Sequence, residues 1–363
     1  MRNVIVLGST GSVGTQALEV IRTHPEDLKL VGVSAFSNKD LVNQQAAEFG
    51  LTHDQIAIGV DEAIALVQSI KADVILNGIT GSVGLGPTMA ALKTGAILAL
   101  ANKESLVAGG PLVKSLARAG QIVPVDSEHS AIAQALRAGT ADEVSKLILT
   151  ASGGPFRGFS KKQLSEVTPE MALKHPTWTM GKVITTNSAS LFNKGLELIE
   201  AHLLFDVPFE QIEVTVHPQS VVHSFVEFVD GSVIAQCSPP DMKQQIALGL
   251  SWPKRLAKVS NAIDWSTSHQ WVFEPLDEQV FSSVAMARQV GIAGLTYPAV
   301  YNAANEQAVE AFHNRAIRFD QIFDVVQDVI SQHSAAPQVT LEAISEAETW
   351  ARATADSLIA KRQ

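Results

Sequence analysis

Hydrophobic and polar positions follow two alternating periods over the first 125 residues of the chain. Short runs rich in Val, Ile and Leu are followed by segments of about ten to fifteen residues whose apolar positions recur at helical spacing. Strands that alternate with helices in this way are typical of a parallel sheet wound on both faces. We therefore expect strands in NVIVLGS, LKLVGVSAF, ADVILNG, AILALAN and GQIVPVD, and helices in VGTQALEVIRTH, DLVNQQAAEFG and GLGPTMAALKTG.

The pattern becomes mixed after residue 125 and helical near the C-terminus. VSKLILTASGGP predicts a strand ending in a glycine-rich loop, and residues 188–205 predict one amphipathic helix. Alternation on both sides of Asp230–Gly231 predicts a β-hairpin with a two-residue turn. The expected organisation is an α/β domain, a mixed α+β domain, a linker and a small α-helical domain, at residues 1–125, 126–251, 252–277 and 278–363.

Composition limits the classes of protein to which the chain can belong. With 363 residues, 46% of them hydrophobic, it can bury a core spread over roughly two or three domains. The single cysteine, Cys237, excludes disulfide scaffolds and cysteine-rich zinc sites and suits a reducing compartment. A net charge of −10 argues against nucleic-acid partners, and no apolar run reaches the roughly 18–20 residues of a membrane span. Because the N-terminus shows no leader pattern, we expect a soluble, cytoplasmic protein.

A glycine-rich turn between the first strand and the first helix predicts a phosphate-binding site. Gly8, Gly11 and Gly14 follow G-x-x-G-x-x-G spacing rather than the commoner G-x-G-x-x-G. In this position, backbone N–H groups and the helix dipole face a pyrophosphate. A purely structural tight turn is the alternative interpretation.

The end of the second strand indicates which nucleotide would bind. Sites for NAD place an acidic residue there, about 20 residues after the turn, to bind the ribose 2′-hydroxyl. This chain instead has Ser37, Asn38 and Lys39 before its first acid, Asp40. Without a carboxylate to repel a 2′-phosphate, NADP(H) is favoured.

Two carboxylates, Asp126 and Glu128, follow the predicted last strand of the first domain. Side chains two apart in an extended segment project to the same side, so both would converge on one point. A hard divalent cation such as Mg²⁺ or Mn²⁺ resolves their repulsion. An exposed polar loop or a helix N-cap is the alternative interpretation.

One face of the predicted helix 188–205 carries Asn193, Lys194 and Glu197 at spacings of three and four. Such a face can supply a third oxygen ligand to a metal while contacting a phosphorylated substrate. Ser188 stands at the expected N-cap, where phosphates bind. A solvated charged face is the competing interpretation.

Three other segments carry residues suited to ligand binding. Ser152 precedes two glycines in LTASGGPFR, a loop suited to phosphate oxygens. Lys103 follows an apolar strand at the edge where open α/β sheets bind ligands. His175 and Trp178 lie in HPTWTMG, a loop bounded by Pro and Gly that indicates either a closing lid or a plain connector.

Together and in this order, these segments resemble the 1-deoxy-D-xylulose 5-phosphate reductoisomerase family. The resemblance covers nearly the whole chain, through GSTGSVGTQ, ANKESL, PVDSEHSAI, LTASGGPFR, HPTWTMG, NSASLFNKGLELIEA, HPQSVVHS, DGSVIAQ, PPDM, WPKR and NAANEQAVEAF. It implies a Rossmann-like NADPH-binding domain (1–125), a catalytic domain with a dimerisation sheet (126–251), a linker (252–277) and a C-terminal helical domain, usually in a homodimer. The implied reaction is a metal-assisted retro-aldol and aldol rearrangement of 1-deoxy-D-xylulose 5-phosphate. Hydride from NADPH then gives 2-C-methyl-D-erythritol 4-phosphate, the committed step of the non-mevalonate isoprenoid pathway.

The resemblance also implies roles for single residues. The implied metal ligands are Asp126, Glu128 and Glu197, which with Lys103 form the catalytic set. The implied substrate contacts are Lys103, Ser127, Glu128, Ser152, His175, Trp178, Ser188, Asn193, Lys194 and Glu197. The implied cofactor contacts are Thr10, Gly11, Ser12, Val13, Ser37, Asn38, Asn102, Glu104, Gly181 and Met242. Where familiar members have Gly-Lys-Asn, this chain has Phe36, Ser37 and Asn38, so Lys39 is the candidate contact for a 2′-phosphate.

Two rival functions are weaker. A semialdehyde dehydrogenase of similar architecture needs a nucleophilic cysteine, and Cys237 lies within an alternating strand. A catalytically silent NADP-binding protein would have no need of the three carboxylates and Lys103, all of which are intact.

Overall fold

The computed structural model describes residues 1–178 and 181–362, and the chain separates into two compact units. The first unit is discontinuous and contains Met1–Leu106, Gly110–Ala133 and Asp241–Asp264. The second contains Val107–Gly109, Gln134–Pro240 and the residues from Trp265 onward.

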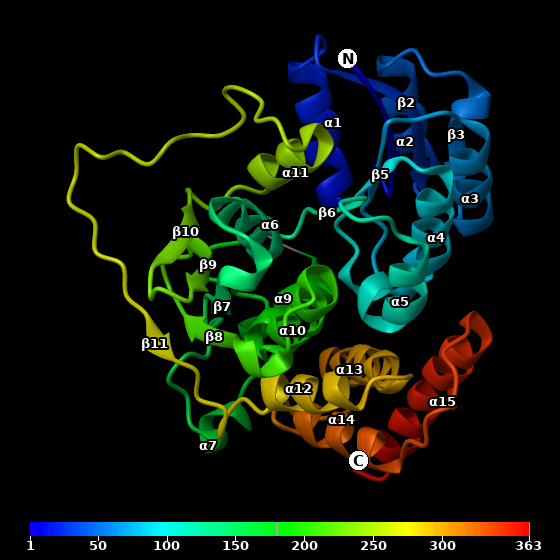
Figure 1. Ribbon diagram of the computed structural model, residues 1–363. Coiled ribbons are helices and arrows are strands. Elements are labelled where there is room, and N and C mark those ends of the chain that lie inside the picture. The colour runs from blue at the N-terminus through cyan, green and yellow to red at the C-terminus, as the bar shows by residue number, and fades with distance from the viewer. Residues whose placement is uncertain (179–180, 363) are drawn as a thin grey trace. The chain divides into compact units, whose positions relative to one another are not determined.

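A parallel sheet forms the centre of the first unit (Figure 1). Its strand order is β3-β2-β1-β4-β5-β6, with every neighbouring pair parallel. The strand order reverses between β1 and β4, which is the switch point where doubly wound sheets bind nucleotides. The strands are β1 (Arg2–Leu7), β2 (Leu28–Ala35), β3 (Ile56–Ile58), β4 (Val74–Asn77), β5 (Ile97–Leu100) and β6 (Ile122–Pro124).

Helices cover both faces of this sheet, as the continuous apolar strands predict. Val4 and Val6 pack on one face with α1, α2 and α11, while Ile5 and Gly32 meet Leu66 of α3 on the other. Successive side chains of β1 therefore serve opposite layers. The helices of this region are α1 (Ser12–Thr23), α2 (Lys39–Glu48), α3 (Val60–Ser69), α4 (Leu85–Thr94), α5 (Lys103–Leu116), α6 (Ser127–Ala135) and α11 (Met242–Ser251), with 3₁₀ turns at His53–Gln55 and Ser82–Gly84.

The position of α11 differs from the predicted domain ranges. Residues 241–264 were expected to belong to the catalytic domain and the linker, yet they fold with the first unit. The reason is apolar burial, because Ile246 and Leu250 are fully buried in the same core as Val4 and Val125. Arg2 fixes the end of this helix by donating to the carbonyl of Trp252 at 2.9 Å.

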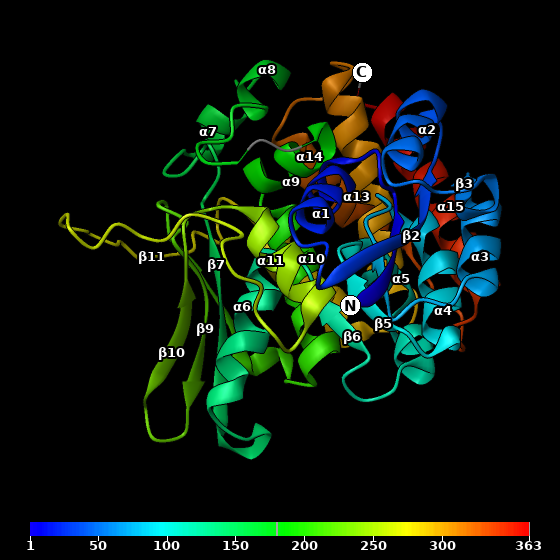
Figure 2. The same ribbon diagram turned by 90° about the horizontal axis from the view of Figure 1, so that it is seen from above.

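A second, mixed sheet belongs to the second unit and runs in the order β10-β9-β7-β8-β11. Figure 2 shows β7, β9 and β10 side by side, with β9 antiparallel to both neighbours. The predicted hairpin joins β9 and β10, but Phe228 donates to the Ser232 carbonyl, so the loop holds three residues rather than two. Gly231 takes a φ of 84° in that loop. The strands are β7 (Val144–Ala151), β8 (Ile212–Val216), β9 (Val222–Phe228), β10 (Val233–Cys237) and β11 (Glu274–Pro275).

The second unit also contains several helices. In it, α10 packs on α12, and α13 packs on α14 and α15. None of the helices in the described residues combines the length and hydropathy that crossing a membrane requires. The helices are α7 (Lys161–Leu164), α8 (Pro169–Ala172), α9 (Lys182–Ala189), α10 (Phe192–Phe205), α12 (Ser283–Ala293), α13 (Tyr297–His313), α14 (Gln321–Gln332) and α15 (Leu341–Ala360), with 3₁₀ turns at Leu136–Ala138, Ala141–Glu143 and Phe209–Gln211.

Close packing of α10 against α13 gives a stability prediction. A Cβ added at Gly195 would lie 2.2 Å from the hydroxyl oxygen of Tyr301, which is fully buried. We expect Gly195→Ala to lower the free energy of unfolding, measured in urea, by about 1–3 kcal/mol because the core is overpacked. The loss should be smaller when Tyr301→Phe removes the clashing oxygen. An equal loss in both backgrounds would contradict this explanation.

Candidate active site

The glycine turn lies at the switch point of the first sheet. Gly8 has a φ of 75°, and a Cβ there would lie 2.8 Å from the carbonyl oxygen of Gly78. A Cβ at Gly14 would lie 2.2 Å from the carbonyl oxygen of Gly8. Both close approaches exclude side chains, so strand and helix pack backbone to backbone.

The first turn of α1 is open to a ligand. Gly11 is its N-cap, and within the described residues no side chain caps this helix. Unsatisfied N–H groups at a helix N-terminus bind anions such as a pyrophosphate. The predicted cofactor contacts Thr10, Gly11, Ser12 and Val13 all belong to this turn.

The loop after β2 is exposed and carries no carboxylate before Asp40. Ser37, Asn38 and Lys39 are all exposed. The Asn38 side chain caps α2 by accepting from the backbone N–H of Leu41 at 3.2 Å. Lys39 begins that helix, so an ammonium is available at the end of β2.

Lys103 and Asp126 meet at the carboxyl edge of β5 and β6. The two strands are parallel, with Leu100 opposite Pro124, so the residues that follow them emerge at the same edge. Lys103 Nζ lies 2.6 Å from Asp126 Oδ2, and the lysine is only 5% exposed. The sequence pattern had placed each residue at the end of a strand of this sheet, but it did not predict the ion pair that the structure shows between them.

Asn102 and Glu104 flank Lys103 and hold its backbone. The Asn102 side chain caps α5 by accepting from Ser105 N–H at 2.9 Å, and it donates to the carbonyl of Gly81 at 2.8 Å. It also donates to Glu104 Oε2 at 3.1 Å. These two predicted cofactor contacts therefore join α5 to the loop that follows β4.

The segment around Asp126 is helical and not extended. The prediction that Asp126 and Glu128 project to the same side of an extended segment was therefore wrong in its reason. Helix α6 begins at Ser127, and Ser130 N–H donates to the Asp126 carbonyl at 2.8 Å. Asp126 acts as the N-cap, because its Oδ1 accepts from the backbone N–H of Glu128 at 3.3 Å. Ser127 Oγ donates to Glu128 Oε2 at 2.5 Å, so the first turn still gathers the three side chains.

Asp126 is ionised despite its surroundings. Burial alone would raise the pKa of its carboxyl group, but the Lys103 ammonium and the adjacent His129 hold that pKa well below its ordinary value. His129 is fully buried, with Nδ1 3.7 Å from Asp126 Oδ1. The sequence interpretation overlooked His129, although its i+3 spacing from Asp126 was a usable signal.

The predicted single helix 188–205 is in fact two helices. Ser188 lies in the last turn of α9 rather than at an N-cap, and α10 begins at Phe192. Leu191 separates them with a φ of 60°, in the left-handed region that a leucine rarely adopts. Gly181, another predicted cofactor contact, is the N-cap of α9.

The predicted polar face of α10 does form. Lys194 Nζ pairs with Glu197 Oε2, and Asn193 Nδ2 donates to Glu197 Oε1. Lys194 is 4% and Glu197 1% exposed, so this is a buried cluster and not a solvated face. A buried carboxylate needs such charged and hydrogen-bonded partners, because burial has removed its hydration.

His175 gathers two of the predicted substrate serines. Its Nε2 lies 3.1 Å from Ser152 Oγ and 3.0 Å from Ser188 Oγ. Its Nδ1 accepts from the backbone N–H groups of Thr177 and Trp178, so Nε2 carries the proton. Burial lowers the pKa of His175, which favours this neutral form.

The loop that carries His175 includes Thr179 and Met180, which lie outside the described residues. The Trp178 ring lies near the buried His223, with centroids 6.4 Å apart. The remaining predicted contact, Met242, begins α11 and packs against the core of the first unit.

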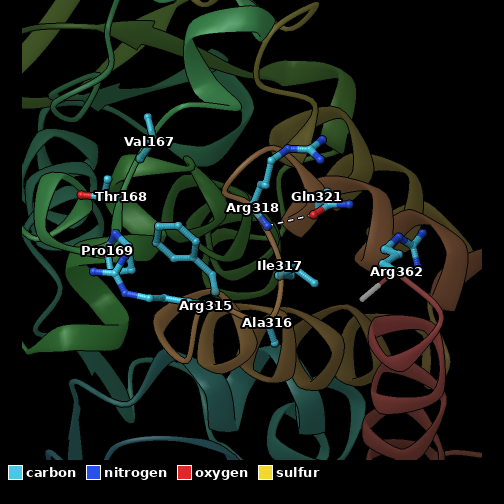
Figure 3. Close-up of a pocket in the computed structure, with 10 residues that line it drawn as sticks. Val167, Thr168, Pro169, Arg315, Ala316, Ile317, Arg318, Gln321 and Arg362 are labelled. Carbon is cyan, nitrogen blue, oxygen red and sulfur yellow. Dashed lines mark hydrogen bonds between the residues drawn. The ribbon is translucent and has the colours of Figure 1, made fainter.

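A separate pocket has a volume of about 500 Å³ (Figure 3). In the described part of the chain, no residue that was predicted to belong to the active site lines it. Arginines line it, and Figure 3 labels Arg315, Arg318 and Arg362. Each arginine already has a carboxylate partner: Arg315 pairs with Glu170 at 2.6 Å, Arg318 with Asp320 at 2.8 Å and Arg362 with Asp328 at 2.5 Å. Because these charges are balanced, the pocket offers an anion little net attraction.

A doubly wound sheet with an uncapped glycine turn at its switch point defines a dinucleotide-binding protein. Family models support a narrower assignment. A model described as 1-deoxy-D-xylulose 5-phosphate reductoisomerase matches residues 4–56 and 50–110, and two C-terminal domain models of that enzyme match residues 122–205 and 237–354.

Proteins with the same family name are similar to this chain over nearly its whole length. The 1-deoxy-D-xylulose 5-phosphate reductoisomerase of Leifsonia xyli subsp. xyli is 59% identical over 361 residues, 99% of each chain. That of Mycobacterium tuberculosis is 53% identical over 372 residues, 98% of this chain and 90% of the relative. The Zymomonas mobilis enzyme in complex with NADPH has a TM-score of 0.92 at 37% identity, covering 99% of both chains. A DOX-P reductoisomerase in complex with NADPH, fosmidomycin and magnesium has a TM-score of 0.90 at 35% identity, covering 99% and 98%.

These matches show that the chain belongs to the 1-deoxy-D-xylulose 5-phosphate reductoisomerase family.

Proposed function

We propose that the chain converts 1-deoxy-D-xylulose 5-phosphate into 2-C-methyl-D-erythritol 4-phosphate, with NADPH as the hydride donor and a divalent cation at the site. The observation that carries the proposal is a pair of largely buried carboxylates, Asp126 and Glu197, each held beside a lysine ammonium. Its support is the full-length similarity to enzymes of that name, one solved with NADPH and magnesium.

The donor set fits a hard divalent cation. We propose Asp126, Glu128 and Glu197 as its ligands, because they offer oxygen atoms only, the preference of Mg²⁺ and Mn²⁺. The low pKa of Asp126 keeps that ligand ionised. When bound, such an ion acts as a Lewis acid toward the carbonyl and hydroxyl oxygens of the sugar.

Lys103 supplies positive charge at the reacting end of the substrate. Its ammonium is buried beside Asp126 and stands at the first position of α5, where the helix dipole adds partial positive charge. A group so placed stabilises negative charge on a sugar oxygen and holds a proton for it.

The phosphate end is proposed to contact Ser152, His175, Ser188, Asn193 and Lys194. The neutral His175 donates through Nε2, as a phosphate oxygen requires. Lys194 adds the only formal positive charge in this proposed set, and Glu197 keeps it in place. Trp178, on the same loop as His175, supports the proposal that this loop covers the substrate and excludes water.

NADPH is proposed to bind along the carboxyl edge of the first sheet. The open first turn of α1 fits its pyrophosphate, since the glycines leave space that a Cβ would fill. Lys39 is the proposed partner of the 2′-phosphate, because Asn38 is engaged as a helix cap.

A homodimer is proposed to form through the β10 side of the second sheet. β10 is an edge strand, and Val229, Val233 and Ile234 beside it are exposed apolar residues. A cytoplasmic location is proposed as well, since the single Cys237 suits a reducing compartment.

A spectrophotometric assay tests the proposed function. We expect NADPH absorbance to fall when 1-deoxy-D-xylulose 5-phosphate and Mg²⁺ are added, and to stop falling when EDTA removes the cation. A folded sample that binds NADPH but leaves its absorbance unchanged would favour a catalytically silent NADP-binding protein.

A further inference from the structure

The short connection between α9 and α10 is tied to the C-terminal helices. Asn305 of α13 is fully buried, and its Nδ2 donates to Asn187 Oδ1 at 3.0 Å. Asn187 directly precedes Ser188 in the last turn of α9. This hydrogen bond between two side-chain amides therefore lies one residue from Ser188, whose hydroxyl oxygen is 3.0 Å from His175 Nε2.

A second tie acts on the other side of Ser188. Ser283 Oγ of α12 donates to the carbonyl of Ser190 at 2.8 Å. The next residue is Leu191, whose φ of 60° is strained for a leucine and requires outside support. Ser188 and the pair Asn193–Lys194 lie on opposite sides of this strained residue, so their relative placement depends on how the connection is held.

Stability alone does not account for the amide at position 305. Among the described residues, Asn305 Oδ1 is buried without a hydrogen-bond partner. A buried amide with only one of its groups hydrogen-bonded stabilises the fold less than an apolar side chain of similar volume. Its unpaired acceptor loses its hydration without gaining a hydrogen bond. The other polar group of this side chain, Nδ2, does have a partner, because it donates to Asn187 Oδ1.

We infer that Asn305 is a positioning residue for the phosphate end of the substrate, acting through Asn187 on the orientation of Ser188. The inference rests on the proposed function, in which Ser188, His175, Asn193 and Lys194 contact the phosphate. Asn305 is fully buried, so its proposed action is indirect, through its hydrogen bond to Asn187. It fixes the last turn of α9 so that Ser188 Oγ stays beside His175 Nε2.

The test compares Asn305→Leu with the matched control Gln307→Leu. Leucine at 305 keeps the volume but removes the donor to Asn187, whereas leucine at 307 removes an amide of the same helix that donates to Asp356 instead. Because the phosphate is bound in the ground state and the transition state alike, we expect Asn305→Leu to raise KM about five-fold, with kcat changed less than about two-fold. The inhibition constant of inorganic phosphate should rise in parallel, and the dissociation constant of NADPH should not change. Gln307→Leu should leave all of these near the parent values.

Two outcomes overturn the inference and differ from failure of the proposed function. An Asn305→Leu protein that only unfolds at lower temperature, with KM and phosphate inhibition unchanged, shows a merely structural asparagine. Equal KM increases in Asn305→Leu and Gln307→Leu also contradict it. Ser188→Ala distinguishes failure of this inference from failure of the proposed function. If that change leaves KM and phosphate inhibition unaltered, the proposed phosphate contacts are wrong. Should Asn305→Leu fail to fold, Asn305→Ser, which is too short to reach Asn187, replaces it with the same expectations.

Discussion

Replacing Glu197 with Gln is expected to lower the turnover of 1-deoxy-D-xylulose 5-phosphate at least about 1,000-fold, since a metal ligand supplies several kcal/mol of transition-state stabilisation. The amide keeps the size of the carboxylate but loses its charge, which both the proposed cation and the buried Lys194 require. The dissociation constant of NADPH, measured by fluorescence titration, should stay the same, because the glycine turn belongs to the first unit and Glu197 to the second.

Glu210→Gln is the matched control for that variant. Glu210 belongs to the same unit but is exposed, so the same chemical change should leave turnover unaltered. Circular dichroism should show a folded Glu197→Gln protein, which separates loss of the site from loss of the fold. Near-normal turnover in Glu197→Gln would remove this residue from the proposed set of ligands.

Gly14→Ala is expected to weaken NADPH binding about 10- to 100-fold, as steric overlap of about 1–3 kcal/mol is relieved by moving the turn. The new Cβ would lie 2.2 Å from the Gly8 carbonyl oxygen and 2.5 Å from Ser9 Cα. Both are backbone atoms that no change of rotamer can move. Relief must therefore shift the N–H groups that face the pyrophosphate.

Gly86→Ala, in α4 of the same unit, is the control for that variant. There the new Cβ meets only the tip of the Ile64 side chain at 3.1 Å, and a flexible side chain can adjust. Isothermal titration of both variants with NADPH, alongside urea unfolding, separates binding from stability. Unchanged affinity in Gly14→Ala would exclude the glycine turn as the cofactor site.

Local patterns predicted the parallel sheet and the polar face of α10 correctly. The strands of the first unit are buried on both faces and are followed by helices, so each strand shows as a continuous apolar run. Lys194 and Glu197 are neighbours because spacing on a helix fixes them, whatever surrounds the helix. The positions of Lys103 and Asp126 after their strands were predictable for a related reason, since parallel neighbours end at one edge, although their ion pair was not predicted.

Features set by distant contacts were not predictable. The break at Leu191 carries no glycine, proline or asparagine, because helices more than ninety residues further along the chain hold it. The meeting of Ser152, His175 and Ser188 joins three segments that no period relates. The resemblance to a family implied that all three contact the substrate, but it did not predict the hydrogen bonds between them. The start of α6 is a different case: DSEH carries an N-cap signal, and the extended interpretation set it aside.

The discontinuous first unit has a practical consequence for protein engineering. A fragment cut after residue 125 would lack α11 and leave Ala99 and Val125, which lie against Gly249 of that helix, facing water, so we expect it to aggregate. A portable nucleotide-binding module must instead splice residues 241–264 back onto the end of the first segment. Chimaeras between members of this family should likewise exchange both stretches together.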